Sequence, residues 1–390
     1  MSPSIFDAAI HCDRGFLPQQ DPLTRLPGSF DPWEAVAHQL PKLFAADQLR
    51  RTLIELPPFP LEEVHNLREL ERAMVLLSYF GHAYVWSGTR PATVLPARLA
   101  VPWCQIAESL GRPPVLSYSS YSLHNFYRFD ELRDIECGNI GLIQNFLGGL
   151  DEEWFILIHV DIERKAAPAM ALLHPCLDAA EAGEAEHLEA LLAGVESSLR
   201  SMHTTMLRMP EHCDPYIYYH RVRPYIHGWK NHPDLPEGLT YEGVEAFGGR
   251  PQQFRGETGA QSSIVPSLDA MLGVAHQEDA LSLYLKEMRT YMPPAHRGFL
   301  GSLERRTPVR AFVEHCGKPS LTAVYNACTE GVERFRSLHL EYAAKYVYHQ
   351  AQTDSKNPHA FGTGGTPFME YLKKHRDETA LSRVDHPHST

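Results

Sequence analysis

The sequence predicts an all-α protein with two domains. Helix-period patterns fill most of the chain, strand patterns are few, and no regular alternation of strands and helices occurs. At 390 residues the chain is longer than a single domain usually is. Glycines at 138, 148 and 149 interrupt the segment 131–150, so we expect a smaller N-terminal domain at 1–137 and a larger helical domain at 138–390.

The smaller domain is expected to hold three helical stretches after an extended lead-in. Residues 1–31 are rich in Pro and Gly, which predicts little regular structure. Helix-period patterns follow at 32–53, 60–86 and 95–111. The second begins with acidic residues, which helix N-termini favour, and Gly111 ends the third.

The larger domain is expected to consist of longer helices. Apolar periodicity supports helices at 154–163 and 186–209, and again at 259–276 and 279–304. A stretch rich in Gly, Pro and charge at 231–259 predicts a surface excursion between them. The longest uninterrupted pattern runs over 320–350, and a last short helix is expected at 367–375.

His339 is the unusual residue of the 320–350 helix. It shares one helix face with an apolar stripe, formed by Cys328, Val332, Phe335, Tyr342 and Tyr346. A buried imidazole needs a partner, and two readings stay open. The commoner one is a hydrogen bond to a neighbour; the other is a metal, most simply a haem iron bound on its proximal side.

Composition excludes several classes of partner. The net charge of −12 and the lack of a basic run argue against nucleic acid, and no apolar stretch is long enough to span a membrane. The N-terminus lacks the basic flank and apolar core of a signal peptide. Seven scattered cysteines without a CxxC motif indicate neither a zinc cage nor a disulfide framework, so we expect a cytoplasmic protein.

Two further residues could carry chemistry in the larger domain. His159 lies on an apolar helix face, where a core histidine is the commoner reading, although Glu163 four residues later would allow a shared metal. Arg223 follows several tyrosines, so its guanidinium either stacks at the surface or binds a substrate carboxylate.

Three other segments allow both a plain and a functional reading. The GTGGT run at 362–366 is either a flexible loop or a backbone cradle for an anion. The aromatic and serine-rich segment 117–126 is either a turn or a pocket wall. Arg336, one turn before His339, is either a solvated charge or a partner for an anionic group bound there.

Eight sequence blocks follow one another over nearly the whole chain. They are RGFLPQQDPL at 14–23, PARLAVPW at 96–103, RPPVLSYSSYSLHNF at 112–126, YIHGWK at 225–230, FRGETGAQSS at 254–263, YLKEMRTYMPPAHRGFL at 284–300, FRSLHLEYAAKY at 335–346 and GTGGT at 362–366. YMPPAHR, SLH and GTGGT are specific as a set. Taken together and in this order, the blocks resemble the indoleamine 2,3-dioxygenase family.

The resemblance implies a haem b enzyme of a microbial source that opens the indole ring of L-tryptophan or a related indoleamine with O2, giving an N-formylkynurenine-type product. It makes His339 the proximal iron ligand and Arg336 a propionate partner, with Gly259 in the loop 256–260 over the haem edge. The implied catalytic and substrate-binding residues are His159, Arg223 and Thr363 together with the pocket aromatics Tyr118, Tyr121, Phe155 and Tyr218. An electron donor that keeps the iron ferrous and a monomeric state are expected.

Several residues depart from the family pattern. Glu257 and Thr258 stand where the family has Gly and Ser, and Pro266 replaces a Gln. His159 stands where vertebrate members have a serine, and it could accept a hydrogen bond from the indole N–H or donate one to O2. Because of these departures, a related haem enzyme performing another indole oxidation, as in the pyrrolnitrin pathway, and a haem or gas-binding protein without activity remain alternatives.

Overall fold

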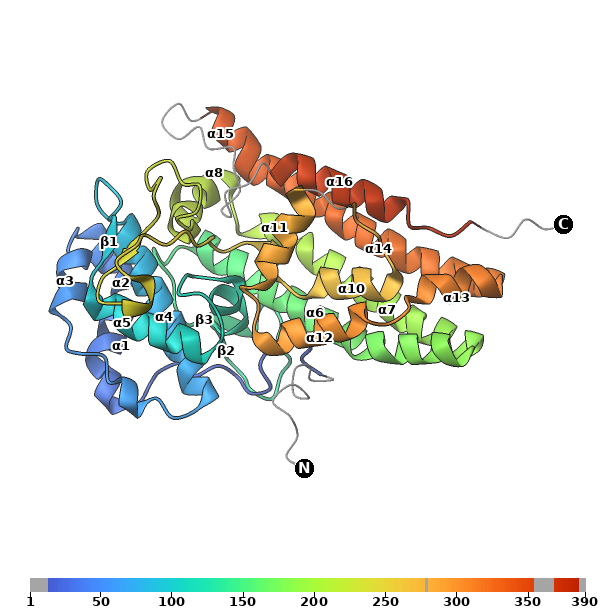
Figure 1. Cartoon of the computed structure of the whole chain (residues 1–390), viewed down its shortest axis with the longest axis horizontal. Coiled ribbons are helices and arrows are strands. Elements are labelled where there is room, and N and C mark those ends of the chain that lie inside the picture. Colours follow the sequence, from blue (N-terminus) through green and yellow to red (C-terminus); the bar gives the residue numbers. More distant parts are fainter. Residues whose placement is uncertain (1–12, 278–279, 354–367, 386–390) are drawn as a thin grey trace.

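The computed structural model describes residues 13–277, 280–353 and 368–385. Within these ranges the chain is mostly helical, which confirms the all-α prediction, and the strands form two small two-stranded sheets (Figure 1). The short helices of the N-terminal part gather at one end of the molecule, and the long helices extend away from them. The lead-in at 1–12 and the GTGGT run fall outside the described residues.

The predicted helix at 32–53 is divided into three. These are α1 (Asp31–His38), α2 (Leu40–Ala45) and α3 (Leu49–Glu55). Pro41 begins a new helix because it has no N–H for the preceding turn. Asp47 separates the next two with a left-handed backbone of φ 53°, which a short polar side chain tolerates better than most.

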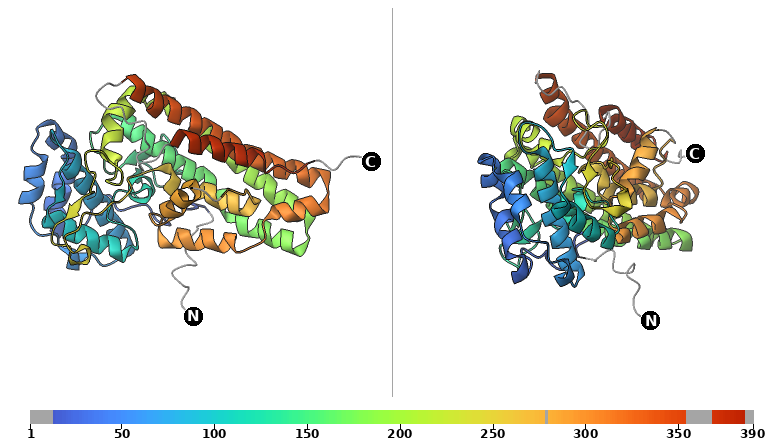
Figure 2. Two further views of the ribbon diagram at one scale, coloured as in Figure 1. Left: turned by 45° about the horizontal axis from the view of Figure 1, so that its top comes forward. Right: turned by 60° about the vertical axis from the view of Figure 1, so that its left-hand side comes forward.

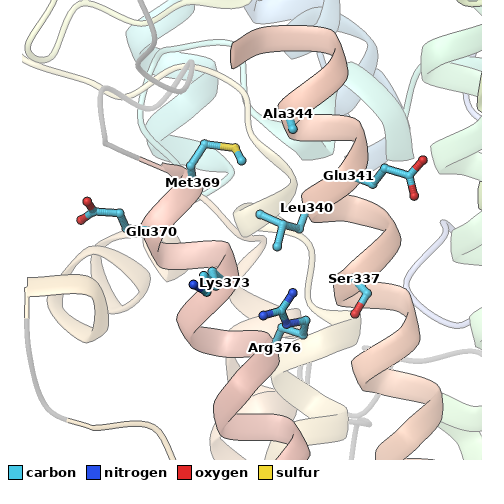
Figure 3. Close-up of a pocket in the computed structure, with 8 residues that line it drawn as sticks. All are labelled: Ser337, Leu340, Glu341, Ala344, Met369, Glu370, Lys373 and Arg376. Carbon is cyan, nitrogen blue, oxygen red and sulfur yellow. The ribbon is translucent and has the colours of Figure 1, made fainter. Parts of the chain in front are cut away.

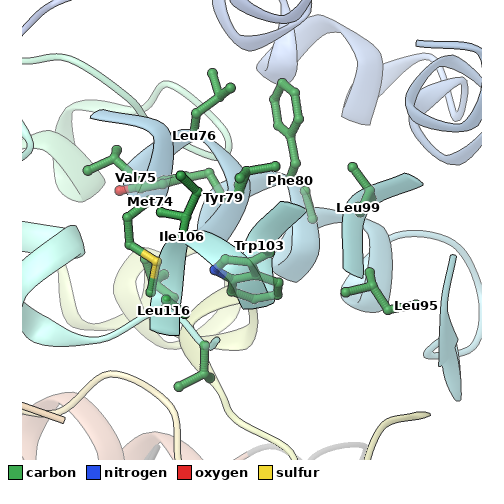
Figure 4. Packing of buried hydrophobic residues seen from close by; sticks show 14 of the residues in the cluster. Met74, Val75, Leu76, Tyr79, Phe80, Leu95, Leu99, Trp103, Ile106 and Leu116 are labelled. Carbon is green, nitrogen blue, oxygen red and sulfur yellow. The ribbon is translucent and has the colours of Figure 1, made fainter. Parts of the chain in front are cut away.

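The core of the N-terminal part forms where α4 (Leu67–Trp86) packs on α5 (Ala97–Ser109). Asn66 caps α4 by accepting a hydrogen bond from the Glu69 backbone N–H at 3.1 Å. Gly81 lets the two helices approach, because a Cβ there would lie 2.2 Å from the Trp103 ring. Figure 4 shows Trp103 among the apolar side chains of this core.

The larger part is built on three long helices. α6 (Leu150–Ala182) continues through two prolines and ends at Gly183, whose φ of 74° reverses the chain into α7 (Ala185–Met206). α14 (Pro319–Ala343) packs on α7, where Gly331 faces Leu199, and on α16 (Phe368–Ala380). The long helices run side by side in Figure 2.

Shorter elements complete the fold. Single-turn π-helices occupy Ser119–Leu123, Tyr218–Val222 and Ala344–Tyr348. The remaining α-helices are α8 (Pro215–Ile217), α9 (Arg223–Ile226), α10 (Ile264–Leu272), α11 (Ala280–Arg289), α12 (Pro294–Glu304), α13 (Val309–Cys316) and α15 (His349–Thr353). β1 (Val94–Leu95) pairs parallel with β4 (Thr240–Tyr241), and β2 (Phe126–Arg128) pairs antiparallel with β3 (Ile140–Leu142).

The stretch 231–259 has many exposed residues, as its composition predicts, but a few apolar side chains anchor it in the core. Leu235, Leu239 and Tyr241 are buried in the same core as α4 and α5. The Tyr241 hydroxyl donates a hydrogen bond to the Pro114 carbonyl at 2.6 Å, and β4 pairs with β1. Polar turn residues set the composition, whereas a few apolar side chains anchor the segment. The boundary at 137/138 stays a prediction.

Among the described helices, none combines the length and the apolar character needed to cross a lipid bilayer. The six described cysteines are all free thiols.

Candidate active site

His339 lies on α14 in a setting that suits a ligand. Its side chain is reached by solvent, yet burial by the surrounding protein lowers the pKa of the imidazole to about 4, with the nearby His159 and Arg336 lowering it further. A group that is both accessible and desolvated lines a recess rather than a convex surface. The ring is therefore neutral at pH 7, which is the form that binds a metal.

His159 reaches the same recess from α6. Its Nδ1 lies 2.7 Å from the Phe155 carbonyl oxygen, one turn earlier. A carbonyl only accepts hydrogen bonds, so Nδ1 carries the proton. Burial lowers the pKa of His159, which keeps the ring neutral and leaves Nε2 as an acceptor. His159 also lowers the pKa of His339, which indicates that two helices distant in sequence bring these imidazoles near each other.

Aromatic rings from three segments surround His159. Phe155 contacts both His159 and Tyr218 at ring-centroid distances of 4.6 Å. Tyr118 approaches His159 edge-on at 6.0 Å, and Tyr121 lies 6.4 Å from Phe155. The structure thus brings together all of the aromatic residues predicted for the substrate pocket, in one cluster of directly packed rings.

Glu163 stabilises this aromatic cluster through hydrogen bonds. Its Oε1 accepts hydrogen bonds from the Tyr118 hydroxyl and the Ser262 hydroxyl, both at 2.9 Å. Burial nevertheless raises the pKa of Glu163 to about 7. The structure does not show His159 and Glu163 as a pair of metal ligands, because the two side chains bond to different partners. This bonding role of Glu163 depends on segments that are distant in the sequence. No local sequence pattern could therefore have indicated it.

The loop 256–263 folds over the same region. Gln261 accepts a hydrogen bond from the Tyr118 backbone N–H and donates one to the Gly256 carbonyl, both at 2.9 Å. Gly256 and Gly228 are in such close contact that a Cβ on either would lie 2.2 Å from the other's nitrogen. Gly259 is exposed, and open space surrounds the position of an added Cβ.

Glu257 is the departure from the family pattern that matters most for this loop. The residue is only 4% exposed, and burial raises the pKa of its carboxyl to about 8. Its backbone N–H donates to the Ile226 carbonyl at 3.1 Å, which fastens it beside the helix of Arg223. Its charge also raises the pKa values of Tyr118, Tyr121 and Tyr218, so the carboxyl lies among the pocket aromatics.

Arg223 begins α9 directly after the π-helix, and it is only 2% exposed. Its guanidinium lies 5.3 Å from the centre of the Tyr219 ring. Burial lowers its pKa, with Tyr218 and Tyr219 opposing the shift. The residue is therefore a buried cation at the aromatic cluster rather than a surface stacking residue.

Arg336 is buried and held by α10 and α16. Its two terminal nitrogens lie 3.1 and 2.5 Å from the Asp269 oxygens, and a further bond reaches the Thr379 hydroxyl. Burial disfavours the charged form of Asp269 and by itself would raise its pKa. Arg336 and His276 outweigh this effect and lower the pKa of the Asp269 carboxyl to about 2. The propionate role of Arg336 stays a prediction. Thr363 lies outside the described residues.

These residues fit a haem. A neutral, accessible imidazole on α14 lies near a second imidazole on α6, and His339 makes no hydrogen bond among the residues that the structure describes. Aromatic rings border the recess on the α6 side. An axial histidine with a partly polar opposite pocket is the arrangement that haem proteins use.

A separate groove of about 460 Å³ lies between α14 and α16 (Figure 3). On α14 it is lined by Ser337, Leu340, Glu341 and Ala344, which point away from the His339 face at 3.6 residues per turn. It is therefore distinct from the histidine recess.

Comparison with known proteins finds relatives over nearly the whole chain. The family model described as Indoleamine 2,3-dioxygenase matches residues 5–382. Indoleamine 2,3-dioxygenase 1 of Rattus norvegicus is 37% identical over 94% of this chain and 92% of its own. Indoleamine 2,3-dioxygenase of Saccharomyces cerevisiae is 33% identical over 94% and 91%. Indoleamine 2,3-dioxygenase acdA of Aspergillus candidus is 33% identical over 96% of both chains.

Proposed function

The chain belongs to the indoleamine 2,3-dioxygenase family, and from this premise we propose that it inserts both atoms of O2 across the indole 2,3 bond of L-tryptophan or a related indoleamine. As a member of this family it is a haem-dependent oxidoreductase that acts on indoles. The product of the proposed reaction with tryptophan is N-formylkynurenine. The observation that carries the proposal is that two imidazoles, His339 and His159, lie near each other and beside an aromatic cluster that also receives Arg223.

His339 would hold the haem as its proximal ligand, and Arg336 would support that face through Asp269 and α16. When bound, haem supplies the one-electron chemistry with O2 that side chains lack. The protein residues then have three tasks. They orient the indole ring, bind the amino-acid end of the substrate and accept the hydrogen bond of the indole N–H.

We propose that His159 accepts the indole N–H. Its neutral ring donates from Nδ1 to the Phe155 carbonyl, so only Nε2 remains for the ligand, and there it can only accept. This favours a contact with the indole over donation to O2. Phe155, Tyr218 and Tyr121 would clamp the ring system in one orientation, because two ring faces and an edge restrict its rotation.

Arg223 is proposed to bind the substrate carboxylate. A carboxylate that leaves water for an aromatic pocket needs a cation in exchange, and a planar guanidinium offers two parallel donors. Thr363 is proposed to contact the polar end of the same substrate. We also propose that a cellular electron donor keeps the iron ferrous and that the protein acts as a cytoplasmic monomer.

Turnover of the haem-loaded, reduced protein with L-tryptophan in 18O2 tests the function. We expect a product that is heavier than tryptophan by two oxygen atoms, both labelled. A product with one labelled atom would instead indicate another indole oxidation. Haem binding without consumption of tryptophan, indole or other indoleamines would contradict the enzymatic function.

A further inference from the structure

A second cluster of metal-ligating side chains lies away from the histidine recess. His276 follows α10, and His375 and Glu378 lie one turn apart on α16. One ligand atom from each of the three lies within 4.8 Å of the others, and within the described residues no other group of three or more His, Cys, Asp or Glu has this geometry. All three side chains are half-buried, so solvent ions can reach them.

The three side chains are in direct contact. The His276 ring stacks on His375 with centroids 4.3 Å apart and planes 18° apart. Nδ1 of His276 lies 2.6 Å from Oε2 of Glu378, which is a hydrogen-bond distance, so an ion bound here would replace that bond. On the other side of the ring, Nε2 lies 3.1 Å from Oδ2 of Asp269.

We propose that His276, His375 and Glu378 bind a divalent transition-metal ion of the zinc class. The ion would take Nδ1 of His276, one nitrogen of His375 and Oε2 of Glu378, and water would complete the shell. Two imidazoles and one carboxylate are a typical ligand set for zinc when a position stays open.

The surroundings of each ligand support this assignment. Asp269 would accept the Nε2 proton of His276, which is the arrangement that fixes the tautomer of a metal-binding histidine. Glu378 Oε1 is held by the Gln277 backbone N–H at 3.3 Å and by Lys374 at 3.4 Å, so Oε2 is the oxygen turned toward His276. The stacking of His375 on His276 keeps its ring beside the other two ligands.

The position of the cluster gives a bound ion a structural consequence. It would join the end of α10 to the C-terminal helix α16, and Asp269 links it to Arg336, three residues before His339. The ion would therefore hold α16 against α14 and support the helix that carries His339. It would be chemically separate from haem iron, since none of its ligands is His339 or His159.

The competing explanation is an ion-pair network without metal. A protonated His276 would donate to Asp269 and Glu378 at once, and these carboxylates raise its pKa despite burial. An ion-pair network of this kind would account for the same distances between His276, Asp269 and Glu378. The difference is that a network gains nothing from added zinc, and that it does not require His375.

Zinc binding by the haem-loaded protein separates the two explanations. We expect isothermal titration with Zn2+ to detect one site per chain, and elemental analysis after dialysis to find one zinc beside one haem iron. His375→Ala and Glu378→Gln should each weaken zinc binding by about 10- to 100-fold or more, the range seen when a supporting residue of a metal site is lost. The Soret spectrum and circular dichroism confirm that each variant is folded.

His187→Ala is the matched control. His187 lies 3.0 Å from Glu184 as an exposed histidine–carboxylate pair without a third ligand, so its loss should leave zinc binding unchanged. The proposal fails if the wild-type protein does not bind one zinc ion per chain. It also fails if His375→Ala binds zinc as tightly as the wild type, or if His187→Ala weakens binding as much as His375→Ala does.

Discussion

The Nδ1 atom of His159 donates a hydrogen bond to the carbonyl oxygen of Phe155, 2.7 Å away and one turn earlier on α6. This one bond decides which chemistry the imidazole can perform. Because the proton is on Nδ1, the neutral ring offers only a lone pair at Nε2. The lowered pKa of His159 keeps this form at neutral pH. The same turn of helix places the Phe155 ring against the imidazole, so tautomer and aromatic wall are set together.

His159→Ser should keep the haem and lose roughly 10- to 1000-fold in kcat/KM for tryptophan, the range for a proton-handling or hydrogen-bonding group. The loss should be much smaller for tryptophan methylated on the indole nitrogen, because that substrate has no N–H to donate. Steady-state kinetics with both substrates measures this, with Kd from the Soret shift where turnover is absent. Equal losses for the two substrates would show that His159 acts on something other than the indole N–H.

His339→Gly should remove the protein ligand while leaving space for a substitute. We expect the purified variant to have lost the wild-type Soret band and to recover haem binding when imidazole is added. The side chain makes no hydrogen bond within the described part of the chain, so the fold should tolerate its removal. Circular dichroism checks the fold, and His203→Gly, on α7, serves as the histidine control. An unchanged haem spectrum in His339→Gly would exclude the proximal role.

Glu163→Gln should change how stability depends on pH. Burial raises the folded-state pKa of Glu163 from its ordinary value near 4.5 to about 7. Its protonated form is therefore favoured by folding, and its contribution is complete below pH 4.5 and lost as the pH rises through 7. Glutamine stays uncharged and can still accept the Tyr118 hydroxyl. The variant should match the wild type at pH 4.5 and be more stable at pH 8, by an amount on the order of 1–3 kcal/mol.

Chemical unfolding at the two pH values measures this difference. Glu152→Gln is the comparison, because Glu152 accepts three backbone N–H bonds that an amide cannot all replace. That variant should be destabilised at pH 4.5 and less so at pH 8, because burial raises the pKa of Glu152 to about 7 as well. A Glu163→Gln effect of the same size at pH 4.5 and pH 8 would contradict a raised pKa.

Local pattern predicted the helices whose amphipathic face agrees with their packing. The periodicity at 320–350 predicted α14 and the face of His339, because apolar residues three and four apart must share one side of a helix. It failed at Asp47, where one left-handed residue redirects the chain. It also did not indicate that Leu235, Leu239 and Tyr241 anchor the polar stretch 231–259 in the core. Secondary-structure propensities are averaged over a window of residues. They therefore cannot detect a single tertiary contact that anchors a segment.

The sequence predicted the residues of the candidate site but not the contacts that support them. The two histidines and Arg223 were unusual in their local setting, whereas the resemblance supplied the roles of the pocket aromatics. The bonds of Glu163 to Tyr118 and Ser262, and of Arg336 to Asp269, join segments between 45 and 99 residues apart. Such pairings depend on the tertiary fold, which one sequence without its neighbours in space does not reveal.

Arg223 decides whether the substrate is an amino acid. The guanidinium is 2% exposed, and burial already lowers its pKa, so a carboxylate would find a cation with little competing water. Each charge-assisted hydrogen bond in such a pair contributes about 1.5–3 kcal/mol. Arg223→Lys keeps a charge but loses the parallel pair of donors, so kcat/KM for tryptophan should fall at least about 10-fold.

Indole, which lacks the carboxylate, separates recognition from structural damage. Its turnover by Arg223→Lys and Arg223→Ala should change far less than that of tryptophan, because neither variant loses a contact with it. Arg221→Ala, an exposed arginine two residues earlier, should leave both substrates unaffected. If Arg223→Ala retains wild-type kinetics for tryptophan, or loses tryptophan and indole turnover equally, then Arg223 does not bind the carboxylate and the preference for an amino acid must come from other residues.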